Sequence, residues 1–201
     1  FVANRNNPSK VWVNDGGGTF SDSGQALGST DSRGIALGDL DGDGDLDAWM
    51  AVYGLPDRVW QNDGNGTFTD SGQALGGATE SYDVALGDID GDGDLDAVVA
   101  RLFGANTVWR NNGNGVFTDS GQALGSHATS GVALADLDGD GDLDVFDVTL
   151  FYESSRVWLN DGSGVFTDSG QVLVGPPHSQ DVELGDLDGD GDVDAFVVNA
   201  G

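Results

Sequence analysis

The amino-acid sequence of 201 residues predicts an all-β fold in which four repeated units each contribute four short strands. Three observations predict it. A unit of about 49 residues recurs four times, Asn-Gly and Asp-Gly pairs separate short apolar runs, and no long apolar pattern has the period of a helix. Four strands in a repeat of this length are typical of a β-propeller blade, and blades must stack because one blade cannot bury both faces. The predicted architecture is a β-propeller of four-stranded blades.

The repeat is clearest at its tryptophans. Trp12, Trp60, Trp109 and Trp158 follow one another at intervals of 48, 49 and 49 residues. The first half of each unit resembles "VWVN" and "TFSDSGQAL" around "DGGG", which predicts a hairpin. The second half resembles "GIALGDL" and "DAWMAV" around an acidic loop, which predicts another. We expect one domain over residues 1–201, with units 1–47, 48–96, 97–144 and 145–195, and with residues 196–201 starting a further strand.

The two ends of the chain match the same part of the repeat. "FVAN" (1–4) begins where "FVVN" (196–199) ends, so both segments compete for one strand position. We therefore expect a segment cut from a longer array, or one designed around it, with one blade completed by the two ends. Four units close alone into a small ring, or two chains join as a head-to-tail homodimer that completes an eight-bladed ring with two-fold symmetry.

An acidic loop occurs once in each unit, as in "GDLDGDGDLDA" (38–48), with five aspartates in nine positions. Two carboxylates about 4 Å apart repel by about 1 kcal/mol in water and about 4 kcal/mol at an effective dielectric constant of 20. Five cannot converge unless a cation lies between them. Gly42 and Gly44 allow the positive φ that a tight curl needs.

The spacing predicts that positions 1, 3, 5 and 9 of each loop bind a metal through carboxylates and position 7 through its carbonyl, with its carboxylate facing solvent. All-oxygen sites of this kind suit Ca²⁺, about four ions in all. The predicted ligands are Asp39, Asp41, Asp43, Asp45, Asp47, Asp88, Asp90, Asp92, Asp94, Asp96, Asp136, Asp138, Asp140, Asp142, Asp144, Asp186, Asp188, Asp190, Asp192 and Asp194.

Two alternatives were weighed for these loops. An EF-hand needs Glu at position 12 and helical flanks. The chain has Met50, Val99, Asp147 and Val197 there, between strand-like segments. A solvated acidic turn without metal is the second alternative, and four copies with ligand spacing argue against it.

The pattern "DLDGDGDLD" between strands, repeated at this period, resembles the FG-GAP/VCBS repeats of the integrin-α-type β-propeller over essentially the whole chain. The resemblance implies a Ca²⁺ loop between two strands of each blade and an extracellular propeller. It also implies a role in adhesion, as a lectin, or as a non-catalytic part of a secreted protein. The chain departs from integrins by lacking the "FG…GAP" residues and by having four units where seven or eight blades are usual.

The charge limits the partners. The net charge is −28, and outside the twenty loop aspartates 7 basic residues face 15 acidic ones, a net charge of −8. Such a chain should repel nucleic acid and anionic membranes. No apolar run reaches the roughly 20 residues of a membrane span, so no membrane insertion is expected. Because millimolar extracellular calcium fills even weak sites, we expect a secreted or cell-surface protein.

The repeated aromatic and polar residues have two interpretations each. The four tryptophans either stack on carbohydrate or pack between blades, and core packing is the commoner role. The Phe20, Phe68, Phe117 and Phe166 set is expected in the core. The repeated "DSGQ" either contacts a ligand or satisfies backbone groups at a bend, and the second is preferred.

The function predicted is a calcium-stabilised binding or scaffold module that recognises a glycan or protein and catalyses no reaction. Its candidate ligand contacts lie in loops that differ between units; drift without function is the alternative. They are Tyr53, Phe103, Phe151, Tyr152 and Arg156. The competing interpretations are a part, catalytic or not, of a secreted polysaccharide-active enzyme using His127, His178 or Asp147, and a purely structural amplified or engineered array.

Overall fold

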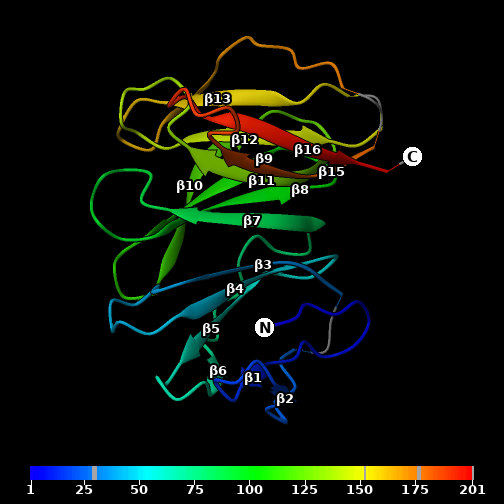
Figure 1. Ribbon diagram of the computed structural model, residues 1–201, viewed down its shortest axis with the longest axis vertical. Helices are drawn as coiled ribbons and strands as arrows, with labels where there is room; N and C mark the ends of the chain where they lie inside the picture. Colours follow the sequence, from blue (N-terminus) through cyan, green and yellow to red (C-terminus); the bar gives the residue numbers. More distant parts are fainter. Residues whose placement is uncertain (29–30, 152, 176–177, 201) are drawn as a thin grey trace.

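A computed structural model describes residues 1–28, 31–151, 153–175 and 178–200 and contains sixteen strands (Figure 1). Within those ranges it contains no helix, and therefore no helix long and apolar enough to cross a membrane. The strands are β1 (Trp12–Asn14), β2 (Phe20–Asp22), β3 (Ser32–Gly38), β4 (Asp47–Val52), β5 (Arg58–Asn62), β6 (Phe68–Asp70), β7 (Ser81–Gly87), β8 (Asp96–Arg101), β9 (Asn106–Asn111), β10 (Phe117–Leu124), β11 (Thr129–Ala135), β12 (Asp144–Thr149), β13 (Arg156–Asn160), β14 (Phe166–Asp168), β15 (Ser179–Gly185) and β16 (Asp194–Asn199).

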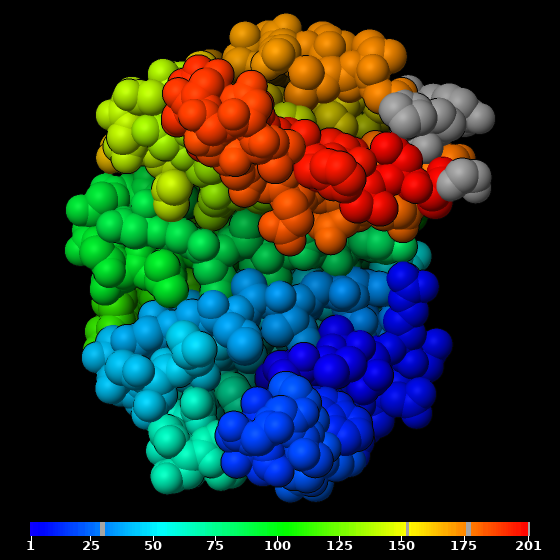
Figure 2. Space-filling model, viewed as in Figure 1, coloured from blue at the N-terminus to red at the C-terminus, as the bar shows by residue number. Residues whose placement is uncertain are grey.

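Consecutive strands pair antiparallel. Three sheets have four strands, β3–β6, β7–β10 and β11–β14, and the pairs β1–β2 and β15–β16 form two-stranded sheets at the two ends. The sheets stack in chain order, with β3 against β7, β7 against β11 and β11 against β15. Figure 2 shows the N-terminal and C-terminal parts at opposite ends of the stack. The all-β, four-stranded repeat is confirmed. No sheet of the described chain closes on itself, and ring closure stays a prediction.

Each complete sheet combines two neighbouring units. The predicted boundary at 47/48 falls at the start of β4, so the first one takes β3 from one unit and nearly all of β4–β6 from the next. The register across this boundary is Leu37↔Ala48, Ala36↔Trp49 and Ile35↔Met50. Neighbouring units are therefore joined by backbone hydrogen bonds as well as by packing.

The core lies between sheets. Trp109 of β9 and Phe117 of β10 pack on Trp49 of the preceding sheet. Their ring centroids lie 6.2 and 4.7 Å from that of Trp49. The core interpretation is confirmed for Trp60, Trp109 and Trp158, which are 6–8% exposed. Trp12 is 44% exposed, because no sheet of the described chain covers that face of β1–β2.

The repeated glutamine connects successive sheets. The side chain of Gln73 donates to Gly115 O (2.6 Å) and accepts from Phe117 N (2.9 Å). Gln25 and Gln122 make the same pair of bonds to the next sheet in line. The expectation that "DSGQ" satisfies backbone groups is thus confirmed, and part of that backbone belongs to the neighbouring sheet.

Asp147 is buried at a second junction between sheets. It accepts hydrogen bonds from Trp158 Nε1 (2.8 Å), Arg156 N (3.0 Å) and Asn106 Nδ2 (3.4 Å). Burial raises the pKa of Asp147 to about 6, against these hydrogen bonds. With both oxygens bonded, its role in the described structure is to join the strands around it.

Asp57 is buried directly before β5, where it bonds the end of β4. Its carboxylate accepts from Val52 N (2.8 Å) and from Ser81 Oγ (2.9 Å), and burial raises its pKa to about 7. In the next sheet an amide has this role, since Asn106 Oδ1 accepts from Arg101 N (3.0 Å).

Asp57→Asn should therefore change the pH dependence of stability. A carboxyl whose folded pKa is raised stabilises the fold fully below its unfolded pKa, and this contribution is lost as pH rises through about 7. The free energy of unfolding of the variant should rise relative to wild type between about pH 4 and 7, by at most about 1.4 kcal/mol per pH unit. Urea unfolding of both proteins across this range, in saturating calcium, measures the difference. A constant difference would contradict the assigned pKa shift.

Candidate metal centre

The acidic loops connect the first two strands of every sheet except β1–β2, and they follow one another along one side of the stack. In the first loop Gly42 and Gly44 have φ of 78° and 92°, as the curl requires. Asp39 accepts hydrogen bonds from the backbone N–H of both glycines, at 2.8 and 3.0 Å. The same two bonds recur at Asp88, Asp136 and Asp186. Four loops thus share one conformation.

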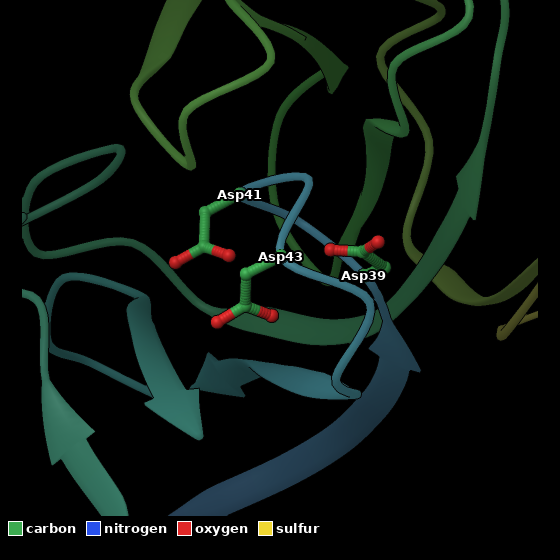
Figure 3. A group of neighbouring side chains, drawn as sticks. All are labelled: Asp39, Asp41 and Asp43. Carbon is green, nitrogen blue, oxygen red and sulfur yellow. The ribbon is translucent and has the colours of Figure 1, made fainter. Parts of the chain in front are cut away.

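The curl brings carboxylates together in every loop, with one oxygen from each residue of a group within 4.8 Å of the others. Figure 3 shows the first group on its loop. The groups are Asp39, Asp41 and Asp43; Asp88, Asp90 and Asp92; Asp136, Asp138 and Asp144; and Asp186, Asp188 and Asp194. In loop numbering these are positions 1, 3 and 5 twice and positions 1, 3 and 9 twice.

Several carboxylate oxygens of these loops are buried without a hydrogen bond. They are Asp41 Oδ1, Asp90 Oδ1 and Asp96 Oδ2. An unpaired buried carboxylate oxygen is costly, and a cation bound to it removes that cost. Asp47, at position 9, instead accepts from Leu40 N (3.1 Å) and Asn62 N (2.8 Å), which hold its carboxylate in place. The donor set, all oxygen on a flexible loop, fits Ca²⁺.

The electrostatics of position 9 favour the same interpretation. Burial, and then the charges of Asp90 and Asp92, raise the pKa of Asp96 to about 6, against its hydrogen bond from Asn111 N. Burial is also the main cause that raises the pKa of Asp47 and Asp144. A carboxylate group in this environment resists ionisation, and a divalent cation reverses that preference.

A comparison with protein-family models matches the FG-GAP-like repeat at residues 1–50, 51–99, 88–146 and 148–197. The chain belongs to the FG-GAP-like repeat family. The matches cover nearly all of its length, and each contains one of the four repeated tryptophans. No curated protein matches the chain at a significant level.

Position 7 of the FG-GAP-like repeat differs from the expectation of a solvent-facing carboxylate. Asp45 is half-buried, with its carboxylate packed against Gly64 of the adjacent hairpin. Asp94 and Asp142 lie in the same way against Gly113 and Gly162. The hairpin glycine has no Cβ, so its backbone leaves room for the carboxylate. Asp192 is exposed, because no such hairpin of the described chain lies beside it.

The sequence reasoning missed the side chains of the neighbouring hairpins that hold the FG-GAP-like loops in place. Asp41 accepts from Gln61 Nε2 (2.8 Å), and Asp90 pairs with Arg110 (2.5 Å). Asn111 Nδ2 donates to Leu40 O (2.8 Å), in the loop of the preceding sheet, and to Leu95 O (3.1 Å). The signal was the asparagine two residues after every repeated tryptophan, at 14, 62, 111 and 160.

Asp41→Asn should weaken calcium binding by the first loop at least tenfold, because it replaces a buried carboxylate oxygen that lacks a hydrogen bond. Asp45→Asn is the matched control with the same charge change, and it should keep the affinity within about threefold because position 7 supplies a carbonyl. Isothermal titration calorimetry measures both. Equal losses would show that charge, and not ligand position, controls binding.

Proposed function

We propose that this protein is a calcium-stabilised, β-propeller-type binding or scaffold module that works outside the cell and catalyses no reaction. The observation that carries the proposal is the convergence of carboxylates in all four acidic loops, with buried oxygens that lack hydrogen bonds in the first two. Four divalent ions would carry +8 against the net charge of −28. Membership of the FG-GAP-like family supports both the propeller and the binding role.

Calcium would stabilise the joints between sheets as well as the loops. The first loop lies between two hairpins. One is β5–β6 of its own sheet, at Gly64, and the other is β9–β10 of the next sheet, where Gly113 O lies beside Gly42. Asn111 holds the backbone of this loop from that next sheet. Ordering the loop therefore orders the contact between two sheets.

Removing calcium should lower stability strongly. Each site that binds the folded chain alone contributes roughly 2.7 kcal/mol when free calcium is 100 times the dissociation constant. The thermal midpoint in millimolar calcium should fall by more than about 10 °C when EDTA is added, and should return when calcium is restored in excess. Magnesium at the same concentration is the control and should restore less. An unchanged midpoint would refute structural calcium.

The non-catalytic role is supported by the positions of the candidate catalytic residues. Asp147 is buried and fully bonded. His127 lies 3.9 Å from Glu153, whose carboxylate also accepts from Ala128 N (2.6 Å). His178 packs edge-on against Phe151. These residues have structural contacts, and the extracellular location follows from the calcium concentration that such sites need.

The candidate ligand surface lies at the end of the sheets opposite the acidic loops. Phe103 and Phe151 are 60% and 51% exposed. Tyr53 is half-buried and stacks on Arg33, whose guanidinium carbon is 4.8 Å from the ring centroid. Arg156 pairs with Asp168 (3.1 Å), and Tyr152 lies outside the described residues. Exposed aromatic rings of this kind suit the apolar face of a sugar or a protein side chain.

Phe103→Ala with Phe151→Ala should reduce binding at least tenfold on a glycan array read in calcium, for any glycan that the wild type binds. Val116→Ala, an equally exposed apolar residue at the other end of the sheets, is the matched control and should bind as wild type. Equal binding by all three proteins would move the ligand site elsewhere.

A further inference from the structure

We propose that the groove beside the C-terminal sheet β15–β16 binds the N-terminal hairpin β1–β2 of a second copy of this chain, head to tail. The inference rests on the joint that the chain itself builds twice between complete sheets. Each half of that joint recurs, exposed, at opposite ends of the stack (Figure 2). The proposal therefore commits to an interaction surface and to its occupant.

The first observation is a free strand edge. Among the described residues β16 pairs with β15 alone, whereas β4, β8 and β12 each pair on both sides. Applied to β16, the register that joins β4 to β5 aligns Ala195 with Trp12, Phe196 with Val11 and Val197 with Lys10 of the copy. An unpaired edge of this kind is a template for another strand.

The second observation is a hollow of the shape that the hairpin fills elsewhere. Between β11–β14 and β15–β16 lie two cavities of about 410 Å³ each, which share Phe146, Leu173 and Ala195 in their linings. In the preceding joint, between β7–β10 and β11–β14, the place corresponding to this hollow is filled by Trp158 and Phe166. The residues at the same repeat positions in β1–β2 are Trp12 and Phe20, which are 44% and 60% exposed.

The third observation is a set of polar groups left over at the same joint. Three repeated glutamines each bond a glycine carbonyl and a phenylalanine N–H of the next sheet, namely Gln25, Gln73 and Gln122. Within the described chain the side chain of Gln171, the fourth, makes no such pair of bonds. Gly18 and Phe20 of a copy offer both groups.

The position-9 carboxylates repeat this pattern. Asp47, Asp96 and Asp144 each accept from the N–H of an asparagine on the neighbouring strand, at 2.7–2.8 Å. Asp194 accepts from Leu187 N (3.0 Å), and no strand of the described chain supplies the asparagine. Asn14 of a copy occupies the corresponding position.

The first strands of the sheets, β3 and β15, show a fourth match between the two ends of the chain. A Cβ on Gly38 would meet Leu95 and Leu86 of the next sheet, whereas a Cβ on Gly185 would meet nothing within 4 Å. The leucines that would cover Gly185 in a copy are Leu37 and Leu46, which are 47% and 56% exposed. The joint is thus complementary along its whole width.

In the described chain, Phe1–Asn4 occupies the place that β16 of the copy would take. Val2 exchanges two backbone hydrogen bonds with Lys10, at 2.7 and 3.0 Å. Phe1 packs edge-on against Phe68, 5.4 Å between centroids, as Trp49 packs against Phe117. Val2 remains 44% exposed and forms a single bridge. The longer β16, with β15 behind it, would displace this segment, and two such joints would close an assembly with two-fold symmetry.

The chain contains no cysteine, so a designed pair tests the register directly. The double variant Lys10→Cys/Val197→Cys places two thiols opposite each other across the proposed joint, at a Cα separation of about 5.5 Å that a disulfide spans. Lys10→Cys/Ala195→Cys is the control, offset by two residues to about 7–8 Å. After oxidation in calcium, the first variant should migrate as a covalent dimer on a non-reducing gel, and the control should form at least tenfold less.

Sedimentation of the wild type in calcium should give twice the chain mass of 20.6 kDa. Deleting residues 1–4 should lower the dimer dissociation constant at least tenfold, because the competing segment is gone. A wild-type mass of one chain, or a disulfide within one chain, would overturn the proposal. Calcium titration of the same samples separates the two proposals, because a monomer that still binds about four ions refutes this joint and leaves the proposed function intact.

Discussion

Repulsion between converging carboxylates is the constraint on which the rest of this structure depends. Each acidic loop folds because glycine N–H groups bond the first aspartate and backbone N–H groups bond the last. These bonds place the carboxylates but do not neutralise them, and some oxygens stay buried and unpaired. A bound cation would neutralise them, and the loops that would bind it are also the points where successive sheets meet.

Three side chains of each complete hairpin make most of the named contacts between sheets. One asparagine bonds the loops of two sheets, one glutamine bonds two backbone groups of the next hairpin, and one tryptophan fills the space between them. All three residue types come from the first hairpin of a unit. The hairpin β1–β2 lacks the preceding sheet and exposes its Trp12 and Asn14, whereas its Gln25 bonds the next sheet.

Much of the architecture was predictable because it follows from local sequence patterns. Asn-Gly and Asp-Gly pairs predict the hairpins, and the spacing of Asp39, Asp41 and Asp43 predicts that they converge. What could not be predicted depends on contacts between units. Gln61 on Asp41, Asp45 against Gly64 and the three bonds of Asp147 arise from distances along the chain that a periodic pattern does not encode. The exposure of Trp12 is of the same kind, since its sequence is that of a core residue and its surroundings are not.

The offset between the sequence repeat and the sheets affects how the fold comes apart. Because β3 and the strands β4–β6 lie in different units and share one sheet, no unit contains a complete sheet. Opening any internal unit strips strands from two sheets at once, so the loss spreads to both neighbours. Most solenoid repeats touch their neighbours through packing alone and can fray one at a time. Here backbone hydrogen bonds join neighbouring units. We therefore expect the described array to unfold with high cooperativity for its size.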